Sequence, residues 1–174
     1  FVALRYFNVA GADPQGRSGQ LGPVATHLIK IASQVVAGLR ESIAIYGDDY
    51  ATPDGTCVRD YIHVSDLAAA HLAALAYLEE GGESCVLNCG YGHGYSVSEV
   101  VRAVERCAGR SLNPTRAPRR PGDPPTLVAD SGALRRTLRW SPRYDNLDVI
   151  INTAVDWEKS VAPHSGGTLG RGQS

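Results

Sequence analysis

The sequence contains no methionine, and its 174 residues begin with Phe1 inside an apolar, strand-like stretch. A complete translation product starts with methionine, so this absence predicts that the chain is a fragment of a longer protein. A charge excess is also missing, because 17 Lys+Arg stand against 18 Asp+Glu. The net charge of −1 therefore gives no sign of a nucleic-acid-binding surface. Lys30 and Lys159 are the only lysines, and the other basic residues are arginines.

Long apolar runs and paired cysteine motifs are absent as well. No stretch approaches the ~20 apolar residues that a membrane-spanning helix needs, and no basic segment followed by an apolar one resembles a secretion signal. The four cysteines form no Cys-x-x-Cys pair, which disfavours a zinc site or a disulfide framework. We therefore expect reduced thiols, a cytoplasmic location, and neither a metal, a membrane nor a nucleic acid as partner.

The residues that are present follow an alternating pattern of strands and helices. Runs of β-branched, aromatic and apolar residues predict strands at 1–7, 43–46, 57–64 and 84–89. Apolar residues at helical spacing predict helices at 23–39, 67–78, 97–107, 131–139 and 146–159. The proline-rich residues 110–128 are expected to be irregular around one or two short strands. No segment repeats, so the pattern predicts an α/β fold.

Local signals mark where two of these helices begin. Ser65 or Asp66 is the expected cap of the second helix. That helix places four residues on one face: Leu67, His71, Leu75 and Leu78. Ser96 and Glu99 form a capping box in front of the third helix, and Gly109 is expected to close it.

The two ends of the chain carry different expectations. The strand at 1–7 has no hairpin partner after it, so we expect its neighbours in the sheet to precede Phe1. The last residues, 161–174, are polar and rich in glycine, and we expect them to be disordered.

Arg5-Tyr6-Phe7-Asn8 stands at the carboxyl end of the first strand, which is where open α/β sheets bind ligands. An aromatic pair beside an amide suits stacking against a ring together with one directed hydrogen bond. The alternative is a buried strand end in which Asn8 caps a turn.

Arg59 and Asp60 are neighbours in a strand-like segment and point to opposite faces of it. A buried arginine is costly unless it is paired or bound to an anion. Arg59 therefore predicts either a structural ion pair or an anion site. His63 is expected to be a satisfied core histidine rather than a catalyst.

Two loops are harder to interpret from their residues alone. Arg119-Arg120-Pro121-Gly122-Asp123 suits the binding of a diphosphate and a ribose hydroxyl, although by itself the segment is better interpreted as a solvated loop. Gly90-Tyr91-Gly92-His93-Gly94 follows a strand, but its spacing is not that of a dinucleotide-binding loop. We expect it to be a tight structural connection.

Several catalytic motifs are missing. Thr26 and Val155 stand four positions before the two lysines, so the sequence has no Tyr-x-x-x-Lys pair that would activate a tyrosine as a base. It also has no Gly-x-Ser-x-Gly elbow, no His-Glu-x-x-His and no P-loop. The residues themselves predict an anion-binding pocket without catalytic machinery.

Taken together, the motifs resemble one family. R-Y-F-N-V-A-G-A, I-A-I-Y-G-D-D-Y, D-G-T-C-V-R-D-Y-I-H-V and R-R-P-G-D-P occur in this order, as in the UDP-glucose 4-epimerase family of extended short-chain dehydrogenases/reductases. The resemblance covers residues 1 to about 159. It implies a Rossmann-type NAD domain with a smaller mixed α/β lobe over the nucleotide sugar. Residues 1–160 would supply that lobe, interleaved with the last strands and helices of the NAD domain.

The resemblance also implies NAD as cofactor and a set of site residues. Tyr6 and Phe7 would lie beside the nicotinamide end of NAD. The other implied residues contact the UDP-sugar: its sugar or phosphates by Asn8, His27 and Leu28, its uracil by backbone groups of Ile43, Ala44, Ile45 and Tyr46, its diphosphate by Arg59 and Arg120, and its ribose by Asp123. Relatives commonly carry a further aromatic residue beyond the R-R-x-G-D motif, where this sequence has Leu127 and its neighbours, so a phenolic contact to the sugar is not implied.

The implied reaction interconverts UDP-glucose and UDP-galactose. In the family a hydride passes from C4 of the sugar to NAD while a tyrosine takes the O4 proton, and it returns to the other face of the 4-keto intermediate. The NAD loop and the Ser, Tyr and Lys of that machinery would precede Phe1, so no catalytic residue is assigned here and the chain alone is expected to be inactive. A homodimer would form through the NAD domain.

Two alternatives remain open on the sequence. One is another nucleotide-sugar enzyme, such as a UDP-pentose 4-epimerase, a 4,6-dehydratase or a UDP-glucuronate decarboxylase. The other is a non-catalytic module that binds nucleotide sugars.

Overall fold

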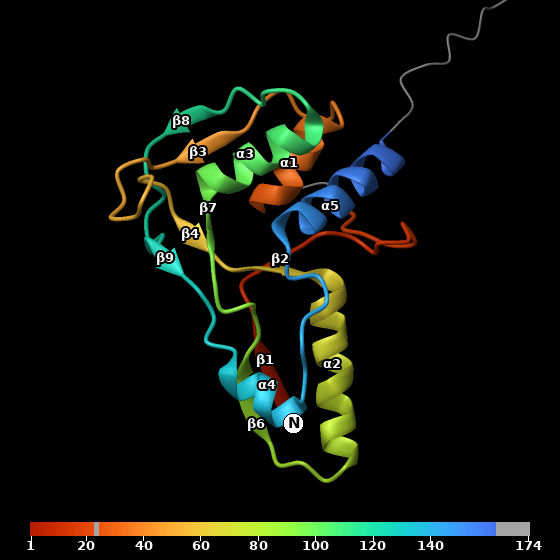
Figure 1. The fold of residues 1–174 in the computed structure, drawn as a ribbon. Coiled ribbons are helices and arrows are strands. Elements are labelled where there is room, and N and C mark those ends of the chain that lie inside the picture. Colours follow the sequence, from red (N-terminus) through yellow and green to blue (C-terminus); the bar gives the residue numbers. More distant parts are fainter. Residues whose placement is uncertain (23–24, 163–174) are drawn as a thin grey trace, which may run out of the picture.

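The structure, a computed structural model, describes residues 1–22 and 25–162 (Figure 1). Two expectations fall elsewhere. Pro23, the expected start of the first helix, and residues 163–174, expected to be disordered, lie outside the described residues, but residues 25–27 are described and are not helical, so the first helix begins only at Leu28. Residues 161 and 162, in contrast, are described, and the last helix runs to Val161.

Strands and helices alternate along the chain as the sequence predicts. In chain order they are β1 (Val2–Arg5), β2 (Asn8–Ala10), α1 (Leu28–Val36), β3 (Ala44–Tyr46), β4 (Val58–Arg59), β5 (Tyr61–His63), α2 (Val64–Glu79), β6 (Cys85–Asn88), β7 (Tyr95–Ser96), α3 (Val97–Ala108), β8 (Thr115–Ala117), β9 (Thr126–Leu127), α4 (Gly132–Leu138) and α5 (Leu147–Val161).

The elements form two regions of the molecule (Figure 1). The upper region of the view contains β3, β4, β7, β8 and β9 with helices α1, α3 and α5, and the lower region contains β1, β6, α2 and α4. Within the described residues the strands pair as four small sheets: parallel β1–β6, parallel β2–β5, parallel β3–β8, and β7–β4–β9. The β2–β5 pair connects the two regions (Figure 1).

The partner of β1 corrects the expectation drawn from the sequence. β1 pairs in parallel with β6, from Val2 opposite Cys85 to Arg5 opposite Asn88, so at least one of its neighbours follows it in the chain. A parallel pair needs a long crossover, which here includes α2, and such a crossover leaves no hairpin signal in the sequence. In the described part of the chain, the other edge of β1 has no strand beside it.

The predicted strand at 57–64 divides at Asp60. β4 pairs with β7 and β9, whereas β5 pairs with β2. The division places Arg59 on a strand of the upper region and Tyr61 on the strand that joins the two regions. The single continuous strand expected from the sequence is therefore wrong, because its two halves belong to different sheets.

Helix caps agree with the sequence at α3 and differ at α2. The Ser96 hydroxyl accepts from the Glu99 N–H and the Glu99 carboxylate accepts from the Ser96 N–H, while Gly109 ends the helix with φ of 64°. At α2 the cap is neither Ser65 nor Asp66. His63 holds that position, and its Nδ1 accepts from the Ser65 N–H at 3.1 Å.

The main core lies where α1, α3 and α5 pack against one another. Ile29, Val104 and Ile151 each have at most 1% of their surface exposed there. Within this core a buried ion pair joins Lys30 on α1 to Glu158 on α5. Among the described residues, no helix combines the length and the apolar character needed to cross a membrane.

Candidate functional site

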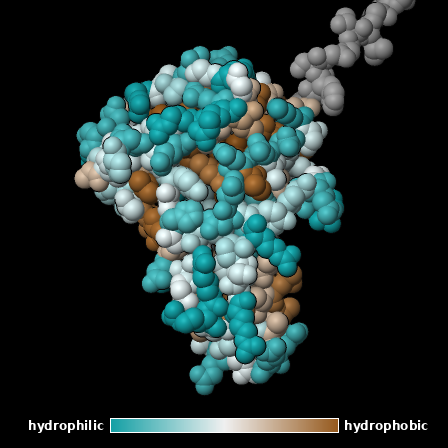
Figure 2. Space-filling view, viewed as in Figure 1, coloured by the Kyte–Doolittle hydropathy of each residue, from teal (hydrophilic) through white to brown (hydrophobic). Residues whose placement is uncertain are grey.

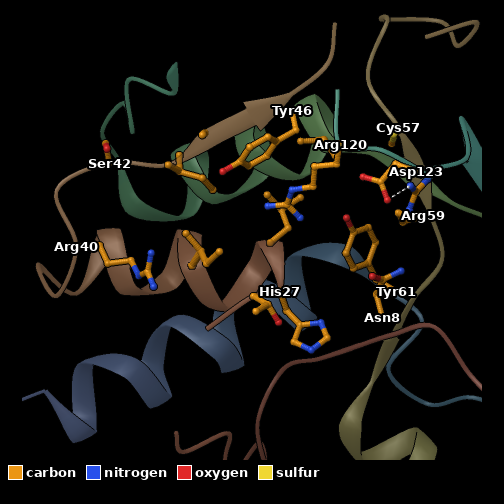
Figure 3. Close-up of a pocket in the computed structure, with 16 residues that line it drawn as sticks. Asn8, His27, Arg40, Ser42, Tyr46, Cys57, Arg59, Tyr61, Arg120 and Asp123 are labelled. Atoms are coloured by element: carbon orange, nitrogen blue, oxygen red, sulfur yellow. Dashed lines mark ion pairs between the residues drawn. The ribbon is translucent and has the colours of Figure 1, made fainter. Parts of the chain in front are cut away.

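A cavity of about 350 Å³ opens between α1 and β3 in the upper region (Figure 3). Its walls come from segments far apart in the sequence: α1 and the residues before it, β3, the β4–β5 segment, and the loop that precedes β9. Such a cavity is large enough for part of a small-molecule ligand.

Two arginines and one carboxylate line one end of this cavity. The Arg59 Nη1 donates to the carbonyls of Val58 at 2.9 Å and Pro124 at 2.8 Å, and its Nη2 lies 3.5 Å from the Asp123 carboxylate. The Arg120 guanidinium stacks over the Tyr46 ring, 3.9 Å from its centroid. These contacts fix both guanidinium groups in place while leaving positive charge in excess, which suits a bound anion.

The neighbouring arginine has a different environment. Arg119 Nε donates to the Asp49 carboxylate at 2.6 Å, and its guanidinium lies 4.2 Å from the centroid of the Tyr50 ring. Arg119 does not line the cavity. It anchors the loop after β3, whereas Arg120, the next residue in the chain, lines the cavity.

A tyrosine and an amide complete this end of the cavity. The Tyr61 ring is buried at 3% exposure, and its hydroxyl points into the cavity (Figure 3). Burial raises the pKa of the Tyr61 phenol, so it stays protonated and able to donate at neutral pH. The Asn8 Nδ2 donates to the Asp60 carbonyl at 3.1 Å, which fixes the orientation of its amide beside Tyr61.

Asp60 explains why these residues are held so closely. Its carboxylate, 2% exposed, accepts from the backbone N–H groups of Tyr91 and Gly92 at 3.1 Å and of Ala129 at 3.2 Å. A Cβ at Gly90 would lie 2.6 Å from the same carboxylate. The Gly-rich loop at 90–94 is thus a structural connection wrapped around a buried acid, as expected from its spacing.

His63 is a structural residue as well. It is fully buried, with Nε2 hydrogen-bonded to the Thr153 hydroxyl at 3.1 Å and Nδ1 occupied by the α2 cap. The Tyr144 ring stacks on it with centroids 4.6 Å apart. Burial lowers the pKa of His63, and an uncharged ring is what the cap requires, because its Nδ1 must accept.

A second cavity of about 420 Å³ adjoins the first, and the two share His27. The aromatic residues Tyr6 and Phe7 line this second cavity together with Val9 and Val64. The loop between β2 and α1 contributes residues 18–20 to its lining. An aromatic and aliphatic wall of this kind suits a flat ring system.

Comparison with known proteins identifies the family. Residues 1–90 match the model of the NAD dependent epimerase/dehydratase family. The chain belongs to the NAD dependent epimerase/dehydratase family.

Individual relatives of this epimerase/dehydratase chain are named UDP-glucose 4-epimerase. The protein from Azospirillum brasilense is 59% identical over 160 residues, which is 92% of this chain and 46% of that protein. The protein from Lacticaseibacillus casei is 51% identical over 92% of this chain and 48% of its own length. The chain thus spans about half the length of the curated relatives it matches.

Solved structures of the same family agree with the fold. The crystal structure of UDP-glucose 4-epimerase from Brucella ovis in complex with NAD superposes with a TM-score of 0.86 at 46% identity, covering 91% of this chain and 49% of that one. The Bifidobacterium longum enzyme in complex with NAD+ and UDP gives a TM-score of 0.86 at 38% identity, covering 92% and 48%.

Most of the residues predicted to contact a UDP-sugar in this epimerase/dehydratase chain line the first cavity. They are Asn8, His27, Leu28, Ile43, Ala44, Tyr46, Arg59, Arg120 and Asp123. The side chain of Ile45 is 2% exposed and points into the core, because successive side chains of a strand point to opposite faces, so its predicted contact with the uracil rests on its backbone groups alone. The predicted pair Tyr6 and Phe7 lies apart from these residues, in the second cavity.

Further residues line the first cavity that the sequence does not predict, namely Thr26, Ile31, Arg40, Ser42, Cys57, Tyr61 and Val97. Alternation along a strand was a usable signal for Cys57 and Tyr61, which stand two positions either side of Arg59. No comparable signal exists for Arg40, which follows the end of α1 and reaches the cavity only through the fold.

Proposed function

We propose that this chain is the nucleotide-sugar-binding half of an NAD-dependent UDP-hexose 4-epimerase that interconverts UDP-glucose and UDP-galactose. The observation that carries the proposal is the meeting of Arg59 and Arg120 at one cavity, although they belong to different segments of the chain. Two fixed guanidinium groups in one wall suit a diphosphate, whose charge they share between them. Asp123, whose carboxylate lies 3.5 Å from Arg59, would accept from a ribose hydroxyl.

The remaining lining residues fit the other parts of a UDP-sugar. Apolar side chains of Leu28, Ile31 and Ala44 give a slot for a planar base. Tyr61 and Asn8 add polar groups to the lining of the first cavity. The sugar would occupy the passage between the two cavities, next to His27, which both cavities share.

The second cavity fits the nicotinamide end of NAD. Tyr6 and Phe7 would hold its ring against the wall completed by Val9 and Val64, and these side chains would exclude water from its face. Bound there, NAD would supply reversible hydride transfer with the sugar. The chain has no Tyr-x-x-x-Lys pair to move the O4 proton, so its own residues bind and orient and do not complete the reaction.

The proposal also includes a cytoplasmic location and, for the complete enzyme, a homodimer. The location is supported by the four cysteines, which form no disulfide with one another. The dimer follows only from the resemblance to the epimerase family.

Calorimetric titration of UDP into the purified chain tests the site. We expect saturable binding that weakens about tenfold or more in Arg59→Ala and in Arg120→Ala, because each change removes charge-assisted hydrogen bonds to phosphate. Arg119→Ala is the matched control, since Arg119 is adjacent but faces Asp49, and it should change the affinity less than twofold. Equal losses in all three variants, or no binding of UDP, would contradict the proposal.

Activity is tested with UDP-galactose and NAD. The chain alone should give no UDP-glucose. Co-expression with the half of the Azospirillum brasilense enzyme that this chain does not match should restore turnover, and Arg120→Ala should again reduce it. Turnover of a UDP-pentose at a higher rate than UDP-galactose would replace the hexose assignment with the pentose one.

A further inference from the structure

The first cavity has two chemically different ends. Arg59, Arg120 and Asp123 lie at one end, whereas Arg40 and Ser42 lie at the other (Figure 3). Apolar side chains of α1 and β3 form the walls between the two ends. The two ends of a ligand that lies along the cavity would therefore contact different residues.

The proposed function sets the direction in which a nucleotide would lie. If the diphosphate is bound by Arg59 and Arg120, the base enters the apolar slot and points away from them. In a pyrimidine nucleotide the ribose is attached at N1, and C4 is the ring atom opposite N1. The substituent at C4 is therefore the part of the base farthest from the ribose, and it is the part that reaches Arg40.

Arg40 is held in a position to read that edge. Its Nε donates to the Gln34 side-chain oxygen at 2.9 Å, which fixes the plane of the guanidinium. Its two Nη groups make no hydrogen bond or ion pair with any other described residue, and its guanidinium points toward the cavity (Figure 3). A guanidinium has donors and no acceptor, so it pairs with a carbonyl oxygen and not with an amino group.

We infer that Arg40 is a specificity-determining residue that binds the 4-oxo group of a uracil base and so selects uridine over cytidine nucleotides. Cytosine carries an amino group at C4, which would face the Arg40 donors without an acceptor between them. Ser42, whose hydroxyl can donate or accept, lines the same end of the cavity as Arg40 and would not by itself distinguish the two bases. The inference rests on the proposed function, because the direction of the ligand comes from it.

UDP and CDP are the probes, since they share the ribose and diphosphate and differ at the edge of the base. Titration of the chain should show UDP bound at least about tenfold more tightly than CDP. This ratio corresponds to one charge-assisted hydrogen bond that UDP makes and CDP does not. Arg40→Ala should weaken UDP binding about tenfold and reduce the preference for UDP to less than about threefold. Arg116→Ala is the matched control, because Arg116 is an exposed arginine of the same region that does not line the cavity, and it should change neither value.

The outcomes separate the two proposals. A wild-type preference for UDP that persists in Arg40→Ala, or equal losses of UDP and CDP affinity in that variant, overturns the role of Arg40 and leaves the nucleotide site standing. Equal binding of UDP and CDP by the wild-type chain does the same. No binding of either nucleotide overturns the proposed function, and the inference with it. A circular dichroism spectrum of Arg40→Ala identical to that of the wild-type chain excludes loss of the fold as the cause.

Discussion

The upper and lower regions of the molecule differ in how well they bury their apolar residues. In the upper region α1, α3 and α5 close around side chains such as Ile151, which is fully buried. In the lower region Leu72 and Leu75 on α2 are 68% and 54% exposed, and Val86 on β6 is 54% exposed. Figure 2 shows hydrophobic surface in the area where Figure 1 places α2.

The difference indicates that the upper region is stabilised by its own core, whereas the lower region leaves packing surfaces open. An unpaired sheet edge and an exposed apolar face are each typical of an element that packs against a further layer of structure. The lower region has both, because one edge of β1 carries no described strand and α2 presents leucines outward. The cavity belongs to the upper region and to the β2–β5 junction, so its geometry depends mainly on the closed core.

The largest expected effect on stability comes from breaking the buried ion pair of the upper region. Lys30→Met leaves the Glu158 carboxylate buried without its partner and should lower the free energy of unfolding by about 3–5 kcal/mol. Urea denaturation of the chain measures this. The control is the double variant Lys30→Met/Glu158→Leu, which removes both charges and should recover most of the loss. A double variant as unstable as the single one would show that packing, and not the charge, sets the cost.

The next effect compares one apolar truncation in each region. Ile151→Ala removes a fully buried side chain and should cost about 2–5 kcal/mol. Leu75→Ala removes an exposed one and should cost less than about 0.5 kcal/mol. Both are measured by the same denaturation experiment. Similar costs for the two variants would mean that the surface of α2 is covered in solution.

A smaller effect concerns pH at the junction of the regions. His63 has a lowered pKa through burial, so the folded chain keeps it uncharged while the unfolded chain takes up a proton near the ordinary value of about 6.5. Protonation therefore favours the unfolded state, and stability should fall as the pH drops below that value. Thermal unfolding of the wild type and of His63→Asn, whose amide can still accept from Ser65 but does not titrate, measures the contribution. An unchanged pH dependence between pH 7 and 5.5 in His63→Asn would assign the acid sensitivity to other groups.

The smallest effect on stability is expected where the lower region is exposed. Leu72→Ser combined with Leu75→Ser should leave the free energy of unfolding almost unchanged and should reduce self-association of the chain. Sedimentation velocity at several concentrations measures the association. The matched control is Leu67→Ser on the same helix, which places a hydroxyl at a buried position and should destabilise the fold. Unchanged association in the double serine variant would show that the chain does not self-associate through α2.

Much of the fold was predictable because its signals are local. The capping box of Ser96 and Glu99 and the glycine that ends α3 are fixed by contacts within a few residues of each other. The second helix shows the limit of such signals. Leu67 and Leu75 stand on one face by spacing, yet Leu67 is buried and Leu75 is exposed, because the structure covers that helix only along a line of small residues that includes Ala70 and Ala74.

The site was predictable in part for a different reason. Arg59, Arg120 and Asp123 were assigned through motifs that the family shares, and the structure brings them to one cavity. Strand alternation turns the side chain of Ile45 into the core, which leaves only its backbone groups for the contact that the motif implies. Arg40 was missed because no motif contains it.

The sequence by itself determined the alternation of strands and helices, the capped helix α3 and the family to which the chain belongs, since each depends on neighbouring residues or on motifs read in order. Only the tertiary structure decided the parallel partner of β1, the division of one expected strand at Asp60 and the separate environments of Arg119 and Arg120. The physical reason is that these depend on which distant backbone groups and side chains meet. The buried carboxylate of Asp60 illustrates this, since it ties β4 and β5 to two loops that follow them by many residues.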